Sequence, residues 1–205
     1  YGNANSGYGH TGSPSVMNPL LSATGEIYTA SSNTWASMPA PPVNFGSDGC
    51  VAAYNGLLYY TQGSNLLIFD TATEAWSQGA NLLLSRVYHG CAFVDDKLYV
   101  TGGNGHNGNR MQQYTVSTNS WQYVASMSTY RHGIAMAAYA GELYVFGGIS
   151  NQPLLSAEKY TPSSDSWSAI ASVPHSTNGF YYGEAATLGD FIYLAGGVIC
   201  TACNN

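Results

Sequence analysis

The chain has little charge. Only 8% of its 205 residues are Asp, Glu, Lys or Arg, whereas soluble proteins carry about a quarter. Five basic residues against eleven acidic ones leave no basic surface to neutralise phosphates, so nucleic acid is not expected as a partner. No apolar run is long enough to span a bilayer, so we expect no membrane insertion. Ser, Thr, Asn, Gln and Tyr must then supply solubility, which favours an extracellular or densely assembled protein over a cytoplasmic one.

Catalytic signatures are also missing. The sequence holds no Gly-x-Ser-x-Gly elbow, no His-Glu-x-x-His metal motif and no Gly-Lys-Ser/Thr phosphate loop. Hydrolase and nucleotide-binding functions are therefore not indicated, and we expect neither a metal nor a cofactor.

What the sequence does have is an internal repeat. Four aromatic residues each stand seven positions ahead of one of the four tryptophans, and the tryptophans recur at intervals of 41, 45 and 46 residues. A second signature, LYY, LYV, LYV or IYL, follows each Trp. The aromatic pairs, which we expect in the core, are Tyr28/Trp35, Phe69/Trp76, Tyr114/Trp121 and Tyr160/Trp167.

One repeat, residues 89–121, contains four short strands. CAFV and KLYVT flank a two-residue Asp-Asp turn, and MQQYTV and NSWQYV flank a Ser-Thr-Asn turn. Each repeat is thus expected to be a four-stranded antiparallel meander. Because one such sheet cannot bury both of its faces, successive sheets are expected to stack around an axis. The sequence therefore predicts an all-β protein, a β-propeller with about four four-stranded blades.

The repeat resembles a known family. Arg131 with HGIAMAAYAGELYVFGG, followed by AEKYTPSSDSW, resembles the kelch repeat, and the resemblance covers nearly the whole chain. It implies a kelch β-propeller. The departures are local: for example, Gly46 and Phe180 stand where the other two copies have Arg86 and Arg131.

The two ends of the chain are expected to be complementary half-blades. Three arrangements stay open: a fragment of a six-bladed propeller, a closed four-bladed ring, and a half-blade exchanged with a neighbouring copy, which would build a filament. The expected kelch domain covers residues 1–199, divided into half-blade 1–38, blades 46–80, 86–125 and 131–171, and half-blade 180–199, with a tail at 200–205.

The four cysteines fall into two groups. Cys200 and Cys203 form a Cys-x-x-Cys pair in the tail, a possible local disulfide. Alignment of the repeats places Cys50 and Cys91 on opposite faces of equivalent inner strands, so we expect these two to be separate buried thiols.

One face of the propeller is the expected binding site. In an up-and-down blade, the loops between the second and third strands and the loops between blades emerge on the same face, called here the loop face. We expect it to bind a protein or peptide, possibly another copy of the chain, with carbohydrate as an alternative ligand. The candidate partner-binding residues are Arg86, Tyr88, His89, His106, Arg110, Tyr130, Arg131, His132, Tyr181 and Tyr182.

Two charged positions allow a second interpretation. The family resemblance implies that Arg86 and Arg131 help to bind acidic peptide motifs, but buried pairing with Glu26 or Glu158 is equally compatible with the sequence. Glu184 stands on an inner strand where the other copies have small residues, and we expect it either to line a water-filled channel or to pair with an Arg, in both cases as a structural residue and not a catalytic one.

Three functions follow from these observations. The first is a non-catalytic protein-interaction propeller, and the alternative is a structural subunit of an extracellular filament or matrix assembled by half-blade exchange. The third is a copper enzyme of the galactose oxidase type, whose propeller resembles kelch repeats. His89 and His132 would be its metal ligands, but they occupy non-equivalent positions in their repeats.

Overall fold

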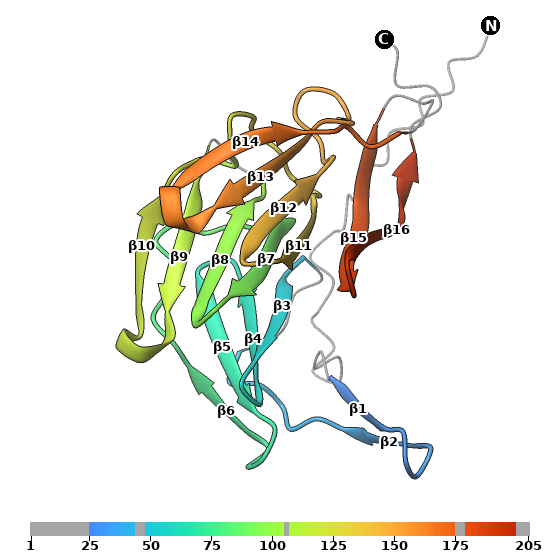
Figure 1. Ribbon diagram of the computed structural model, residues 1–205. Coiled ribbons are helices and arrows are strands. Elements are labelled where there is room, and N and C mark those ends of the chain that lie inside the picture. Colours follow the sequence, from blue (N-terminus) through green and yellow to red (C-terminus); the bar gives the residue numbers. More distant parts are fainter. Residues whose placement is uncertain (1–24, 44–47, 105–106, 175–178, 200–205) are drawn as a thin grey trace, which may run out of the picture.

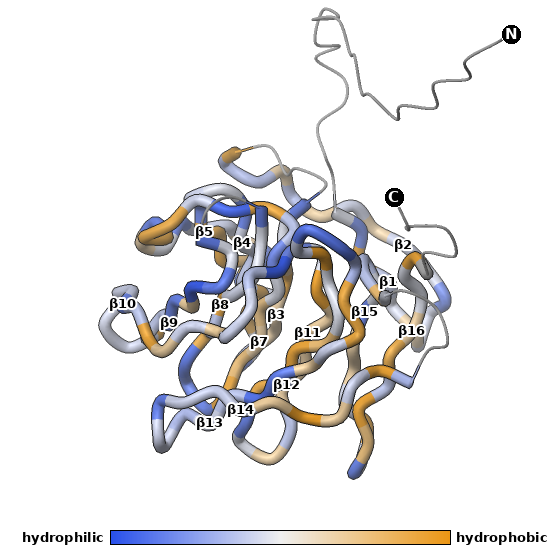
Figure 2. Tube along the Cα trace, turned by 90° about the horizontal axis from the view of Figure 1, so that it is seen from above, coloured by the Kyte–Doolittle hydropathy of each residue, from blue (hydrophilic) through white to orange (hydrophobic). Residues whose placement is uncertain are grey.

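The chain forms antiparallel β-sheets arranged about one axis (Figures 1 and 2). The structure is a computed structural model that describes residues 25–43, 48–104, 107–174 and 179–199. Within these ranges three sheets have four strands each and two sheets have two, and every sheet follows chain order. This arrangement confirms the predicted all-β propeller with a half-blade at each end. No helix in the described ranges is long and apolar enough to cross a membrane.

The strands are short and their bounds repeat from blade to blade. The first half-blade consists of β1 (Glu26–Thr29) and β2 (Thr34–Ser37). Three complete blades follow. The first blade consists of β3 (Cys50–Tyr54), β4 (Leu57–Gln62), β5 (Asn65–Asp70) and β6 (Ala75–Gln78), and the second consists of β7 (His89–Val94), β8 (Lys97–Gly102), β9 (Met111–Thr115) and β10 (Ser120–Val124). The third blade consists of β11 (Ala135–Tyr139), β12 (Glu142–Phe146), β13 (Ala157–Thr161) and β14 (Ser166–Ile170). The last half-blade consists of β15 (Phe180–Leu188) and β16 (Phe191–Ile199).

The first strand of each blade lies nearest the axis. Strands β3, β7, β11 and β15 contact one another in that order, and Figure 2 shows them following each other around the centre. These inner strands are built of small and apolar residues, which allow the sheets to approach closely. The loop between the second and third strands of each blade therefore opens on the same side as the loop into the next blade.

Aromatic side chains join each blade to the one before it. Trp121 donates its Nε1–H to the carbonyl oxygen of Ala80 over 2.8 Å, and Trp167 donates to Ala125 over the same distance. Trp76 makes the equivalent bond to Pro39. At each of these three blade junctions a Trp side chain is thus partly buried and has its N–H bonded, which explains the period of the repeat.

The turn before each Trp is a second junction element. In the second blade, the 3-10 turn η1 (Val116–Thr118) ends at Asn119, which has φ 47°. The Asn119 side-chain oxygen accepts hydrogen bonds from the Tyr114 hydroxyl and from the Ala80 N–H, both at 2.8 Å. In the third blade η2 (Pro162–Ser164) is followed by Asp165, which plays the same part. Asn and Asp tolerate this left-handed backbone better than other non-glycine residues.

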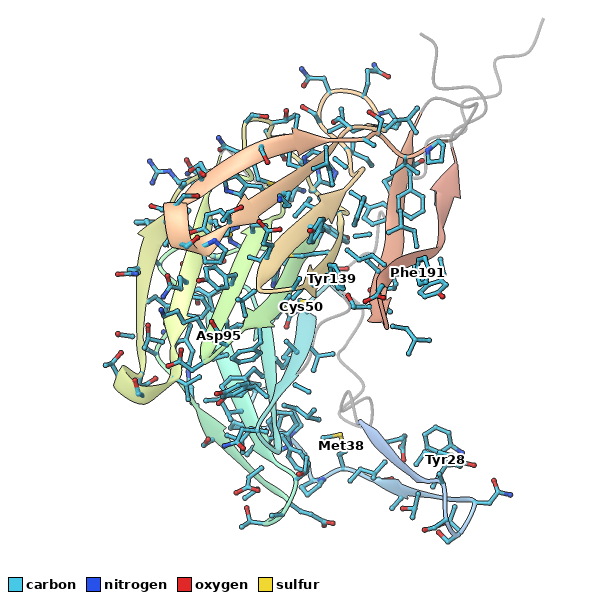
Figure 3. The ribbon with its side chains drawn as sticks, viewed as in Figure 1. Tyr28, Met38, Cys50, Asp95, Tyr139 and Phe191 are labelled. Atoms are coloured by element: carbon cyan, nitrogen blue, oxygen red, sulfur yellow. A yellow bond between two sulfur atoms is a disulfide. The ribbon has the colours of Figure 1, made fainter. Side chains whose placement is uncertain are left out.

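The aromatic pair of the first half-blade is not in the core. In the three complete blades Phe69, Tyr114 and Tyr160 are buried as expected, and their Trp partners are half-buried. Tyr28 and Trp35 keep 48% and 69% of their surface exposed. Figure 3 shows Tyr28 on a hairpin that projects from the body of the molecule. The expectation of a buried pair is wrong at this position because, among the residues that the structure describes, strands β1 and β2 form a two-stranded sheet with no inner hairpin beside it.

The expectation for Cys50 and Cys91 is also wrong, because the two residues form a disulfide. Their side chains do point to opposite faces of equivalent strands. However, β3 and β7 belong to neighbouring blades, and opposite faces are the ones that meet between neighbours. Their Cα atoms are 5.9 Å apart, within the normal range for a disulfide. Cys200 and Cys203 lie outside the described residues.

Candidate functional site

A chain of backbone hydrogen bonds surrounds the axis on the loop face. The Tyr88 N–H donates to the Asp48 carbonyl oxygen at 3.0 Å, the Gly133 N–H to the Tyr88 carbonyl at 2.8 Å, and the Tyr182 N–H to the Gly133 carbonyl at 2.8 Å. Asp48, Tyr88 and Gly133 lie just before the inner strands of the three complete blades, and Tyr182 lies near the start of β15. They therefore form the rim of the axial opening, and we call this opening the mouth.

Two rim residues have a costly backbone conformation. Tyr88 has φ 58° and Tyr182 has φ 55°, close to the φ of 61° at Gly133. The left-handed region suits glycine but places the Cβ of a large side chain against the following carbonyl group. Three successive repeats thus share this backbone at the rim, and only one of the three residues is the type that adopts it without strain.

Aromatic rings gather at the mouth. The Tyr88 and Tyr182 rings meet edge to face with centroids 5.5 Å apart, and Tyr181 lies 5.4 Å from Tyr182. The His132 ring lies 6.5 Å from Tyr182 and 6.1 Å from Tyr130. These five residues, here called the aromatic cluster, come from three blades that only the fold brings together.

Gly133 makes room for one of these rings. A Cβ at this position would lie 2.7 Å from the Tyr182 ring, so the ring packs directly over the glycine backbone. The Tyr182 side chain consequently leans back across the third blade toward Tyr88 of the second blade.

The mouth opens into two adjoining cavities. The outer one, of about 250 Å³, is lined by Asp48, Tyr88, His89, Gly133, Ile134, Tyr182 and Glu184, with the glycines at 49 and 183. The inner one, of about 270 Å³, continues between the inner strands past the disulfide and is also lined by His89 and Glu184. Glu184 is exposed on β15 and faces this channel.

The two arginines predicted to bind a partner are buried. Arg131 has no exposed surface; its Nη2 forms an ion pair with Glu158 at 2.8 Å, and its Nη1 donates to the carbonyl oxygens of Gly147 and Ser156. Arg86 donates in the same way to the carbonyls of Gly102 and Arg110. Burial lowers the pKa of both guanidinium groups, that of Arg86 to about 10.

These arginines are therefore structural. Each occupies the equivalent position in its blade and satisfies carbonyl groups at the ends of the second and third strands. The buried pairing with Glu158 that the sequence left open is the correct interpretation for Arg131, and direct partner binding is wrong for both residues because neither side chain reaches the surface.

His89 is also largely buried. Its Nε2 lies 2.8 Å from the Thr61 hydroxyl oxygen, and that hydroxyl donates to the Cys50 carbonyl at 3.4 Å. Burial and the charge of Arg86 lower the pKa of His89 from 6.5 to about 3, so the ring is neutral near pH 7. Burial also lowers the pKa of His132.

The remaining candidates are spread around the loop face. Tyr130 of the aromatic cluster donates its hydroxyl hydrogen to the Asn104 side-chain oxygen at 3.4 Å. Arg110 lies on the outer side of the second blade, with its guanidinium 5.3 Å from the centre of the Tyr123 ring. His106 lies outside the described residues. Within the described ranges, no group of three or more His, Cys, Asp or Glu side chains could hold a metal ion.

Sequence reasoning missed two rim residues. Asp48 and Gly133 occupy the position of Tyr88 in their own repeats, so an alignment on the inner strands could have found both. Asp48 follows a long loop and Gly133 has no side chain, and neither matched a search for aromatic or basic residues.

Comparison with known proteins supports a family. Residues 85–128 and 130–174 each match the Kelch motif, and these segments include the second and third blades. The chain thus contains kelch repeats, which supports the kelch-repeat family. It is 34% identical over 137 residues to Kelch-like protein 36 of Rattus norvegicus, which covers 62% of this chain and 22% of that protein.

Other kelch proteins give the same result. Kelch-like protein 25 of Xenopus tropicalis is 29% identical over 182 residues, which covers 79% of this chain and 30% of that protein. The chain thus spans less than a third of the length of these relatives. A solved structure, that of YjhT, superimposes with a TM-score of 0.69 at 23% identity, over 77% of this chain and 59% of that one. This similarity supports the β-propeller fold.

Proposed function

We propose that this kelch propeller is a non-catalytic interaction module that binds a protein or peptide partner at the mouth through the aromatic cluster. The support comes mainly from the backbone of Tyr88 and Tyr182. Each large residue in the left-handed region costs roughly 1–2 kcal/mol, and Gly133 demonstrates that glycine fits the same position. The presence of a strained Tyr at two rim positions is best explained if the Tyr side chains bind a partner.

The chemistry of the cluster suits a protein surface. Tyr side chains have large rigid rings and a hydroxyl group, so they bury apolar area and form directional hydrogen bonds with little loss of conformational freedom. Tyr182 keeps 46% of its surface exposed, and Tyr88 and Tyr181 are partly exposed beside it. A partner that covers these rings would gain apolar contact on a platform that is already ordered.

A peptide selection tests this proposal. A random peptide library is selected against the whole chain, and the enriched peptides are measured against the wild type, the Tyr88→Gly/Tyr182→Gly variant and a Tyr123→Ala control. Tyr123 has the same 46% exposure as Tyr182 but lies on the outer strand β10. We expect the double variant to lose at least about tenfold in affinity and the control to lose none. Peptides that bind all three proteins equally would contradict the proposal.

We propose as a second function that the half-blades of two copies complete one blade. The support is the concentration of exposed apolar side chains on the two end hairpins: Tyr28 and Trp35 at one end, and Leu188, Phe191 and Tyr193 at the other. In complete blades Leu98 stands opposite Tyr114 and Leu143 opposite Tyr160. The same register pairs Ile192 of one copy with Tyr28 of another.

The blade junction offers a second match for this pairing. The residue four positions after each blade's Trp accepts the next blade's Trp N–H, as at Pro39, Ala80 and Ala125. Ala171 is the next member of this series. In an exchanged blade its carbonyl would accept the Nε1–H of Trp35. Within one chain, the bond from Trp76 to Pro39 holds β2 near the first blade, and Figure 1 shows β1 and β2 well apart from β15 and β16.

Light scattering across a range of protein concentrations tests the exchange. We expect mass to rise with concentration and the emission of Trp35 to shift to the blue, and we expect Trp35→Ala to weaken both changes. A chain that stays monomeric, whether Trp35 remains exposed or becomes protected by closure of its own ring, would contradict exchange between copies.

We also infer that the chain works in an oxidising compartment. The support is the disulfide between Cys50 and Cys91, since such bonds persist mainly outside the reducing cytosol. Mass spectrometry of protein alkylated without reduction tests this inference on material from the native source. Two alkylated thiols at these positions would contradict it.

A further inference from the structure

The mouth has an unbalanced set of charges. All five Lys and Arg residues lie in the described ranges, and none of them lines the outer cavity. Arg86 and Arg131 are buried, Lys159 is paired with Glu142 at 2.9 Å, and Arg110 stacks on Tyr123. Lys97 begins β8 at the end of the strand far from the loop face.

Two carboxylates line the same cavity. Asp48 precedes β3 of the first blade, and Glu184 lies on β15 of the last half-blade, so the fold brings them to one opening from distant parts of the sequence. The Asp48 carboxylate interacts with the Tyr88 hydroxyl and raises the pKa of that hydroxyl. A carboxylate has about four acceptor positions, so one carboxylate can accept hydrogen bonds from several donors at once.

His89 adds a neutral imidazole to the wall of the cavity. Its Nε2 and the Thr61 hydroxyl oxygen form a hydrogen bond of 2.8 Å. Its Nδ1 is buried and has no hydrogen-bond partner within the described part of the chain, on a side chain that lines both cavities. A buried polar atom without a partner is unusual and marks this wall as a place for a ligand's polar group.

The aromatic faces complete the set. Tyr88 and Tyr182 both line the cavity with their rings in edge-to-face contact, and the faces of such rings attract cations. The mouth therefore combines two carboxylates, aromatic faces and a buried imidazole nitrogen without a partner. The carboxylates and the ring faces share a preference for a ligand that is positively charged and donates hydrogen bonds.

We propose that the mouth binds a cationic side chain of the partner, and specifically the guanidinium group of an arginine. A guanidinium is flat enough to stack on a Tyr ring and has five donors in a fixed plane, which suits two carboxylates better than the point charge of a lysine ammonium. This proposal rests on the proposed function and specifies the chemical group that the partner presents. The partner would present a cation, whereas exposed arginines on this face would have bound an acidic motif.

Short peptides test the charge directly. Three blocked peptides of the form Gly-Ala-X-Ala-Gly, with X as arginine, citrulline or glutamate, are titrated into the whole chain at millimolar concentrations and followed by NMR. Citrulline matches the shape of arginine without its charge. We expect the arginine peptide to bind at least about tenfold tighter than the citrulline peptide, and the glutamate peptide not to bind. Raising salt from ~50 to ~500 mM should weaken the arginine peptide.

Variants assign this binding to the mouth. Asp48→Asn and Glu184→Gln should each weaken the arginine peptide by about fivefold or more. Asp95→Asn is the matched control, because Asp95 is an exposed carboxylate on the opposite face and Asn tolerates its φ of 53°. No response to any peptide, equal binding of the three peptides, or mouth variants that behave like the control would overturn the proposal.

The peptide selection separates this proposal from the proposed function. Enriched peptides that contain arginine and lose affinity in the Tyr88→Gly/Tyr182→Gly variant support both. Peptides that have no basic residue but still lose affinity in this variant support the interaction module and overturn the proposal of a cationic ligand. Peptides that ignore the tyrosines overturn both.

Discussion

Gly133 and Tyr182 occupy the same position of successive repeats, and they are joined by a 2.8 Å hydrogen bond from the Tyr182 N–H to the Gly133 carbonyl oxygen. Because one residue is glycine, the ring of the other packs over its backbone and reaches Tyr88. The mouth thus depends on a difference between repeats as much as on their similarity.

A methyl group at Gly133 should therefore displace the Tyr182 ring. The added Cβ would lie within 3 Å of two ring atoms and would sit in the left-handed region at φ 61°. We expect Gly133→Ala to lower the free energy of unfolding by about 1–3 kcal/mol and to weaken partner binding. Denaturant unfolding and a titration with a selected peptide measure the two effects. Gly141→Ala, also at positive φ but with open space around it, separates backbone strain from the collision.

The buried ion pair should be far more important for stability than the exposed one. Arg131→Ala would leave Glu158 charged and unpaired in the core, together with two carbonyl groups, so we expect a loss of about 3–5 kcal/mol. Lys159→Ala removes the partly exposed pair with Glu142 and should cost less than about 1 kcal/mol. Urea unfolding of the two variants measures the contrast. Similar losses of stability in the two variants would contradict the burial of the Arg131–Glu158 ion pair.

His89 should make the protein sensitive to acid. Its pKa is about 3 in the folded state and near 6.5 when unfolded, so between these values only the unfolded chain takes up the proton. The free energy of unfolding should consequently fall as the pH falls from 6.5 toward 3. Where His89 is protonated in the unfolded chain and neutral in the folded one, the fall is about 1.4 kcal/mol for each pH unit. His89→Gln should flatten this part of the profile. A variant whose unfolding depends on pH as steeply as the wild type would contradict the assignment.

Reduction of the disulfide should destabilise the propeller. The bond between Cys50 and Cys91 closes a loop across a sequence separation of 41 residues, which restricts the unfolded chain by about 4 kcal/mol in the loop-entropy account. We expect a lower melting temperature in reducing buffer and in Cys50→Ser/Cys91→Ser, with no further effect of reductant on that variant. The same melting temperature with and without reductant in the wild type would argue against the bond.

The repeat made most of the fold predictable from the sequence. Aromatic pairs at a fixed spacing identify one strand hairpin in each copy, and turn residues identify the rest, so the antiparallel meander follows from local patterns. The burial of Tyr28 and Trp35 did not follow, since it depends on what lies beside the first half-blade. A local pattern specifies a hairpin, whereas burial is a property of its neighbours.

The candidate site was predictable only in part. Aromatic residues at the starts of the inner strands placed Tyr88, Tyr182 and their neighbours on the loop face. The sequence could not distinguish an arginine that binds a partner from one that satisfies carbonyl groups, because Arg131 has the same place in the repeat in either case. The disulfide was missed for a related reason, since faces that are opposite within equivalent strands become adjacent between blades.

The most direct test of the central claim is to measure affinity and stability together in Tyr182→Gly, with a peptide selected against the wild type. Glycine removes the ring but suits φ 55°, so we expect the affinity to fall at least about tenfold while the free energy of unfolding changes by less than about 1 kcal/mol. Unchanged affinity, or a loss of several kcal/mol in stability, would show that Tyr182 is a structural residue and would contradict a binding site at the mouth.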